Sequence, residues 1–315
     1  MRATSGLILA GMAVLGLVAA SCADDDDAAP TTTATTTATI DAAAATTAGE
    51  PTTPTTAAAT TAGETTTAGK ATTTVAAAKA TTATTASTAR ASGDIQVLAA
   101  SSLTDAFNEI ATAFSTANPA AKVTFVFGGS SDLSATINNG GPADVFASAD
   151  QASMKKVSDA ANTADEPEIF ANNLLAIMTQ PGNPKGIAGL ADLANPDLTV
   201  ITCDPTVPCG AYAQQVFAAA GVTVTPKSLE ENVKGVVTKV TAGEGDAGIV
   251  YATDVQAAGD EAGGVPIPSD VNVVAQYPIV IVKQATNPTA ARAFIDFVLS
   301  GAGRQILARY GFTGP

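Results

Sequence analysis

The stretch IQVLAASSLTDAFNEIATAF, from Ile95 to Phe114, decides the class of fold. Residues 95–100 are almost all apolar and predict a strand, and from Leu103 the apolar residues recur at helical spacing. Ser101, Ser102 and Thr104 stand at the junction. A strand that runs directly into a helix is typical of α/β folds, and hydroxyls at the junction can either cap the helix or face a ligand.

The same alternation continues to the end of the chain. Short apolar runs predict strands at residues 95–100, 122–127, 143–147, 174–179, 198–202, 247–251 and 273–282. Helical patterns occupy residues 103–117, 132–139, 151–160, 211–220, 232–242, 253–258, 288–299 and 303–310. This order predicts an α/β fold with largely parallel sheets, and residues 94–315 are enough for two lobes.

The first 93 residues have a different composition. Arg2 and the apolar run from Leu7 to Ala20 predict a secretory signal, which is too short to span a membrane. AASC at residues 19–22 resembles the lipobox of bacterial lipoproteins, without its usual leucine, and implies lipidation of Cys22; an ordinary cleaved signal is the alternative. Residues 23–93 are rich in Thr and Ala and lack large apolar residues, which predicts a disordered tether.

Charge and composition exclude several classes of function. The net charge of −14 argues against nucleic-acid binding, which depends on Lys and Arg at the phosphates. The chain contains no histidine, which removes Ser-His-Asp and Cys-His catalysis and the commonest ligand of transition metals. If Cys22 is lipidated, Cys203 and Cys209 remain as an even pair in an exported protein, and this favours a disulfide.

Several predicted helix starts could together bind an anion. Ser130 and Ser131 repeat the junction of the opening stretch, Cys209 follows a further strand, and another helix begins near Val233. Helix starts carry free N–H groups and partial positive charge, so helices aimed at one cleft would bind an anion without a cationic side chain. Serine is also an ordinary N-cap residue, so recurrence alone leaves the structural interpretation open.

A set of motifs in the same order then resembles a known family. AASSLTDAF, GGSSDL, ADVFASAD, VPCGAYA, GDAGIVYATD, YPIVIV and RYGF, spread over residues 94–312, are similar to the substrate-binding protein of the molybdate ABC importer. The resemblance implies a type II periplasmic-binding-protein fold, with a ligand cleft between lobe 1 (94–173 and 277–315) and lobe 2 (174–276). The cleft would hold one tetrahedral oxyanion, molybdate or tungstate.

The resemblance also implies the residues that contact the oxyanion. Ser102 and Ser130 would each give a hydroxyl and a backbone N–H, Cys209 and Val233 would give backbone N–H groups, and Tyr251 would give its phenol. Tyr251 is otherwise an ordinary core tyrosine. Molybdenum would be bound only as molybdate, through these residues, and no cofactor is expected. Neutral donors can supply several charge-assisted hydrogen bonds without the loss of rotamer entropy that ordering Lys or Arg would cost.

The function implied is that of an exported binding protein, not an enzyme. It would be a monomer, lipid-anchored on the extracytoplasmic face of the cell membrane, that delivers molybdate to the permease and ATPase subunits of an ABC importer. Three alternatives stay open: a receptor of the same fold for sulfate, phosphate or another oxyanion; a hydrolase that pairs a serine with a lysine base; and a surface protein that binds nothing. The two serines lack the SxxK spacing that such a hydrolase would favour.

Overall fold

The computed structural model describes residues 90–315. The predicted signal at residues 1–22, including Cys22, and the predicted linker up to residue 89 lie outside the described residues. The first strand begins at Ser92, slightly before the predicted start of the globular part at Asp94. Among the described helices, none is long and apolar enough to cross a membrane.

The strands and helices alternate as the sequence predicts. The strands are β1 (Ser92–Ala100), β2 (Ala120–Gly128), β3 (Val145–Ala147), β4 (Glu168–Thr179), β5 (Val200–Cys203), β6 (Ser228–Glu230), β7 (Ala247–Tyr251), β8 (Gly263–Pro266) and β9 (Val274–Ile281). The α-helices are α1 (Thr104–Ala117), α2 (Ser130–Asn138), α3 (Gln151–Asp159), α4 (Pro208–Ala220), α5 (Val233–Thr241), α6 (Ala252–Ala258), α7 (Pro288–Leu299) and α8 (Gly301–Arg309). Short 3₁₀ turns are η1 (Ser101–Leu103), η2 (Leu190–Ala194) and η3 (Gly259–Glu261).

The sheet is mixed, and in this respect the prediction of largely parallel sheets is wrong. The strand order is β2-β1-β3-β9-β4-β7-β5-β6, with β8 also paired to β4. β1 pairs in parallel with β2 and β3, and β5 with β6 and β7. β4 is antiparallel to β7, β8 and β9, and β3 is antiparallel to β9. Strand direction depends on these long-range pairings, which the apolar runs alone do not reveal.

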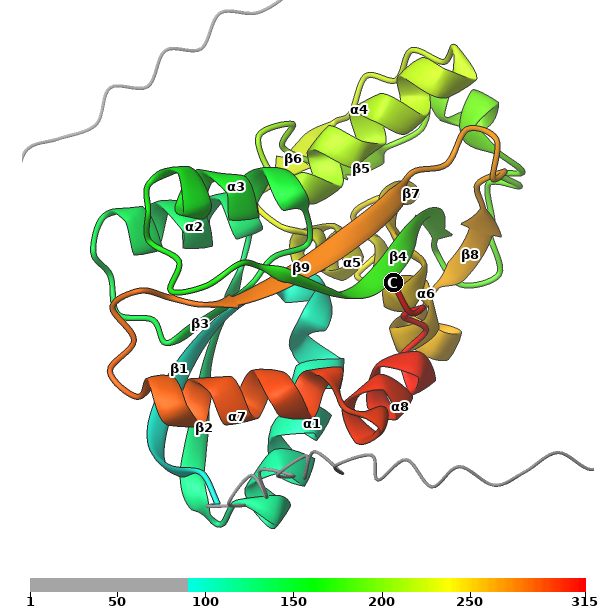
Figure 1. The fold of residues 1–315 in the computed structure, drawn as a ribbon. Coiled ribbons are helices and arrows are strands. Elements are labelled where there is room, and N and C mark those ends of the chain that lie inside the picture. Colours follow the sequence, from blue (N-terminus) through cyan, green and yellow to red (C-terminus); the bar gives the residue numbers. More distant parts are fainter. Residues whose placement is uncertain (1–89) are drawn as a thin grey trace, which may run out of the picture. The chain divides into compact units, whose positions relative to one another are not determined.

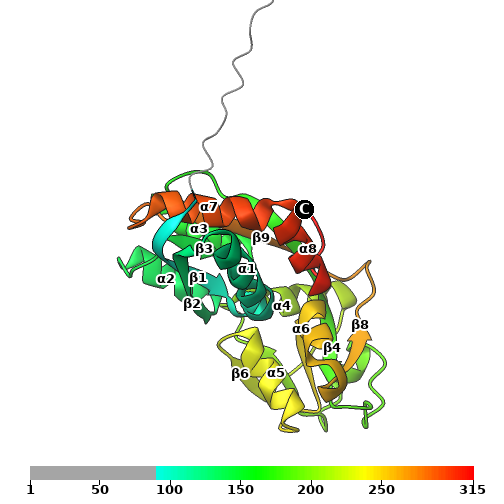
Figure 2. The ribbon, with the colours of Figure 1, turned by 90° about the horizontal axis from the view of Figure 1, so that it is seen from below.

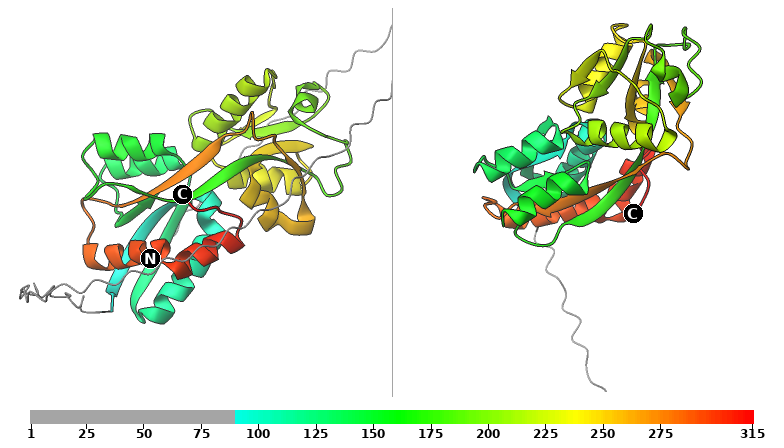
Figure 3. Two further views of the ribbon diagram at one scale, coloured as in Figure 1. Left: turned by 45° about the vertical axis from the view of Figure 1, so that its right-hand side comes forward. Right: turned by 90° about the horizontal axis from the view of Figure 1, so that it is seen from above.

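Two long strands connect two groups of elements. β1–β3 lie with α1–α3, α7 and α8, whereas β5–β8 lie with α4–α6 (Figure 1). β4 and β9 run from one group to the other, which Figures 2 and 3 show from other sides. β4 pairs with β9 up to Leu174 and with β7 from Leu175 onward, so it changes partner between the groups. The predicted lobe boundaries stay a prediction.

Amphipathic helices and aromatic side chains build the core of the first group. In α1 the buried residues Ala106, Phe107, Ile110 and Phe114 share one face, as expected for a helix that packs on a sheet. Phe107 and Phe114 both contact the buried Phe294 of α7 edge to face. Contacts of this kind add to the stabilisation from buried area, and they fix α1 behind the strand end where Ser102 lies.

Candidate ligand-binding site

A small cavity lies where the two groups of elements meet. The positions in it that are open to the centre of a water-sized sphere fill about 10 Å³, so it suits a small, compact group rather than a bulky organic ligand. Residues from both groups line it: Ala100, Ser101, Ser102, Gly128, Gly129, Ser130, Ala149, Val207, Pro208, Cys209, Asn232, Val233 and Tyr251. All five residues that the sequence nominated for oxyanion contacts are among them.

Helix starts surround the cavity. Ser102 lies in η1 directly before α1, and Ser130 is the first residue of α2. Cys209 is in the first turn of α4, and Val233 is the first residue of α5. The first N–H groups of a helix have no acceptor within the helix and carry partial positive charge. These N–H groups therefore favour an anion in the cavity.

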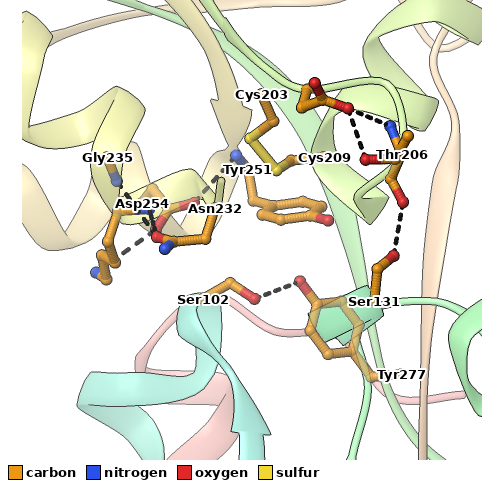
Figure 4. Close-up of a disulfide and its surroundings, with 12 residues drawn as sticks. Ser102, Ser131, Cys203, Thr206, Cys209, Asn232, Gly235, Tyr251, Asp254 and Tyr277 are labelled. Atoms are coloured by element: carbon orange, nitrogen blue, oxygen red, sulfur yellow. Dashed lines mark hydrogen bonds and ion pairs between the residues drawn. A yellow bond between two sulfur atoms is a disulfide. The ribbon is translucent and has the colours of Figure 1, made fainter. Parts of the chain in front are cut away.

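The two serine hydroxyls already have hydrogen-bond partners in the protein. Ser130 Oγ accepts from the N–H of Ala149 at 3.0 Å, which leaves the serine proton free to be donated. Ser102 Oγ lies 2.9 Å from the phenol oxygen of Tyr277 on β9, and either oxygen could donate (Figure 4). Burial raises the pKa of Tyr277, so its phenol stays protonated. When that phenol donates, Ser102 keeps its own proton for an acceptor in the cavity.

Tyr251 presents an unpaired phenol. Its side chain is buried, and within residues 90–315 its hydroxyl has no hydrogen-bond partner. Figure 4 shows its ring between the disulfide and Tyr277. Burial raises the pKa of the Tyr251 phenol well above its usual value, so the hydroxyl can donate but does not ionise. An unsatisfied buried hydroxyl costs about 1 to 3 kcal/mol, a cost that an anionic acceptor in the cavity would remove.

The loop before α4 is closed by a disulfide between Cys203 and Cys209, whose Cα atoms lie 5.7 Å apart. Gly210 follows, and a Cβ at this position would lie 2.0 Å from the carbonyl oxygen of Asp204. Only glycine allows the start of α4 to approach the end of β5 so closely. Together the disulfide and Gly210 fix the backbone of Cys209 at the cavity.

Asn232 caps α5 in a way that leaves Val233 available. Its side-chain oxygen accepts from the N–H groups of Lys234 and Gly235, at 3.1 and 3.3 Å. The N–H of Val233, one position earlier, is left for another acceptor. Asparagine before a helical pattern is an N-cap signal, so the sequence already contained the clue to this lining residue.

Charged groups lie behind the lining rather than in it. Among the described residues that line the cavity there is no Lys, Arg, Asp or Glu. Lys234 Nζ, behind Val233, lies 3.5 Å from Asp254 Oδ1. Burial raises the pKa of Asp254 to about 6, although Lys234 and the N–H of Tyr251 act in the opposite direction. Within residues 90–315, no group of three metal-ligating side chains is placed to hold a metal ion.

Two nearby carboxylates are structural. Asp150 caps α3 by accepting from the N–H of Ser153 at 3.0 Å. Asp144 accepts from the N–H groups of Gln96, Thr286 and Asn287 and so ties β1 to the start of α7.

Sequence reasoning did not nominate Tyr277, and it named Ser131 only as part of a helix start. Tyr277 opens the quoted motif YPIVIV, but nothing in the motif shows that its phenol reaches Ser102. Ser131 Oγ donates to the carbonyl oxygen of Thr206 at 2.6 Å and so links α2 to the loop before α4 (Figure 4). Both contacts join segments that are far apart in sequence.

Residues 95–313 match the family model for bacterial extracellular solute-binding proteins. The chain belongs to this family. Its members are binding proteins rather than enzymes. Among its relatives, the molybdate-binding protein ModA of Mycobacterium tuberculosis is 41% identical over 221 residues, which cover 70% of this chain and 85% of ModA.

Two further similarities agree with this assignment. ModA of Escherichia coli is 32% identical over 231 residues, covering 70% of this solute-binding protein and 89% of ModA. The solved structure of the periplasmic molybdate-binding protein of Azotobacter vinelandii matches with a TM-score of 0.62 and 20% identity, over 70% of this chain and 99% of that one. That structural match supports the α/β periplasmic-binding-protein fold.

Proposed function

We propose that this solute-binding protein captures molybdate, or tungstate in its place, and delivers it to an ABC importer. Ser102, Ser130, Cys209, Val233 and Tyr251 would contact the oxyanion. The observation that carries the proposal is the small cavity lined by helix starts and hydroxyls from both groups of elements, including the buried phenol of Tyr251, which has no partner within residues 90–315. The identity to two molybdate-binding proteins supports this choice of ligand.

The donors suit a fully ionised tetrahedral anion. The N–H of Ala149 donates to the hydroxyl oxygen of Ser130, and the phenol of Tyr277 can donate to that of Ser102. Each serine can then donate its own proton to the ligand. The lining residues bring no carboxylate that could accept a proton from the ligand. Hydrogen bonds to a charged group contribute about 1.5 to 3 kcal/mol each. Several of them, less the cost of association, could reach the roughly 12 kcal/mol of nanomolar binding.

The two groups of elements would act as the two lobes of a type II binding protein. In this proposal residues 94–173 and 277–315 form lobe 1, residues 174–276 form lobe 2, and the ligand lies between them. β4 and β9 would serve as the hinge crossings, since each runs from one group to the other.

We also propose that the protein is exported and held at the membrane. The signal would be cleaved off before Cys22, Cys22 would be lipidated as the first residue of the mature protein, and residues 23–93 would tether the binding domain to the extracytoplasmic face. The importer's permease and ATPase subunits would be its partners. Mass spectrometry of the mature N-terminus tests the anchor: an unmodified cysteine, or cleavage elsewhere, contradicts it.

Titration calorimetry of the full chain with sodium molybdate tests the ligand. The expected result is one ion bound per chain with submicromolar or tighter affinity. Tungstate should bind at the same site and compete with molybdate. No detectable heat and no competition with either ion would overturn the proposal.

A further inference from the structure

Three segments that line the cavity are joined behind it by one ammonium group. Lys234 Nζ lies 2.9 Å from Asp105 Oδ2 and 3.5 Å from Asp254 Oδ1. Each of these residues is close in sequence to a residue that lines the cavity. Asp105 follows Ser102 in the first turn of α1, Lys234 follows Val233, and Asp254 follows Tyr251.

The bond from Lys234 to Asp105 crosses between the two groups of elements, because α1 belongs to the first group and α5 to the second (Figure 2). Contacts from Ser131 and Gly129 also cross. Ser131 binds the Thr206 carbonyl, and a Cβ on Gly129 would lie 2.6 Å from the carbonyl oxygen of Glu231. Figure 4 shows Ser131 and Asp254 on opposite sides of Tyr251.

The three charged groups differ in exposure. The side chain of Asp254 is 1% exposed, that of Lys234 31% and that of Asp105 46%. Burial lowers the pKa of Lys234, but Asp254 and Asp105 together outweigh it and hold the pKa above its usual value. If α1 moves away, Lys234 keeps Asp254 as its partner, and the half-exposed Asp105 is hydrated. The crossing bond can therefore break and re-form without leaving a buried charge unpaired.

We propose that Lys234 is a positioning residue whose ion pair with Asp105 holds the cleft closed over the bound oxyanion. The inference rests on the proposed function. Asp254 keeps the ammonium in place and also accepts from the N–H of Tyr251 at 3.1 Å, so one network fixes the residues behind Ser102, Val233 and Tyr251.

We call the ion pair between Lys234 and Asp105 the latch. Asp105→Asn in the full chain tests it, because this change removes only the crossing partner at a half-exposed position. Calorimetry with molybdate in low-salt buffer should give a dissociation constant raised roughly two- to five-fold, the range for a partly exposed ion pair. In high salt the variant and the wild type should have the same dissociation constant, because salt screens the ion pair in the wild type too. Asp105→Glu should restore the wild-type value.

Lys239→Met is the matched control. Lys239 lies on the same helix with similar exposure, and its ion pair with Glu230, at 2.6 Å, stays within the second group. This variant should bind molybdate as the wild type does. Lys234→Met should weaken binding, and adding Asp105→Asn to it should cause no further loss, because both variants break the same bond.

The outcomes separate the two proposals. Equal molybdate affinity of Asp105→Asn and wild type in low salt would overturn the latch and leave the proposed function intact. Additive losses in the double variant would overturn it as well. Failure of the wild type to bind molybdate would overturn the proposed function, and the latch would fall with it.

Discussion

The two sides of the cavity differ in how their donors are satisfied. On one side, which we call the serine wall, Ser102 and Ser130 both already have hydrogen-bond partners, Tyr277 and the N–H of Ala149. On the other side, which we call the amide wall, Cys209 and Val233 offer backbone N–H groups, and the phenol of Tyr251 is buried without a partner among the described residues.

The difference suggests a division of roles. Partners on the serine wall orient each hydroxyl before any ligand arrives, so little entropy is lost on binding. The phenol of the amide wall has no partner among the described residues and can donate to an acceptor that enters the cavity. The serine wall is thus expected to define the position of the ion. The amide wall is expected to be stabilised when the ion binds.

Removing a hydroxyl from the serine wall should have the largest effect. Ser102→Ala and Ser130→Ala should each weaken molybdate binding more than ten-fold, because each loses a charge-assisted hydrogen bond worth about 1.5 to 3 kcal/mol. Ser134→Ala is a matched control, since Ser134 is buried on the same helix α2 but donates to the carbonyl of Ser131. Calorimetry that finds wild-type affinity in both serine variants removes the serine wall from the site.

Tyr251→Phe should have effects of opposite sign on binding and stability. Molybdate binding should weaken about ten-fold through loss of a donor to a charged group. The empty protein should become more stable, by about 1 kcal/mol, because a buried unsatisfied hydroxyl is removed. Calorimetry and thermal unfolding measure the two effects. A variant less stable than the wild type without ligand would show that the phenol is satisfied in the empty protein.

Opening the disulfide should have a smaller effect on binding. The double variant Cys203→Ser with Cys209→Ser loses about 2 kcal/mol of stability by the loop-entropy estimate, which corresponds to a fall in Tm of about 4 to 8 °C. Molybdate affinity should fall only about three-fold, because the amide of Cys209 remains but is held less firmly. Mass spectrometry of protein purified from an exported source should find both cysteines oxidised, and free thiols there would refute the pairing.

The smallest predicted effect is a pH dependence of stability from Asp254. Its pKa is raised from 3.8 to about 6, so its contribution to stability is present below about pH 4 and is lost as the pH rises through 6. The Tm of Asp254→Asn minus that of the wild type should therefore increase between about pH 5 and neutral pH. A difference that does not change with pH would show that the carboxylate has no raised pKa in the folded protein.

Much of this site could be predicted from sequence because its features are local. A strand, a polar junction and a helix follow one another within about twenty residues from Ile95, and Asp150 was recognisable as a cap from its place before a helix. Helices α1 and α7 also agree closely with their predicted ranges, since their apolar residues recur at clear helical spacing.

The remainder depends on pairings between distant segments. β6 and β8 were not predicted, because residues 228–230 and 263–266 are too short for a periodic pattern. β4 begins at Glu168, before the predicted strand at 174, because its first half pairs with β9. The contacts of Tyr277 with Ser102 and of Lys234 with Asp105 likewise join residues that no local pattern connects.

Anion selectivity is the most direct test of the central claim that rigid neutral donors on two walls hold one tetrahedral dianion. Thermal unfolding of the full chain should be compared with molybdate, tungstate, sulfate and phosphate at equal concentration. At a hundred times its dissociation constant a ligand stabilises by about 2.7 kcal/mol, which raises Tm measurably. Molybdate and tungstate should both raise Tm, and the smaller sulfate and phosphate should do so weakly or not at all. A sulfate or phosphate response equal to that of molybdate would contradict the account.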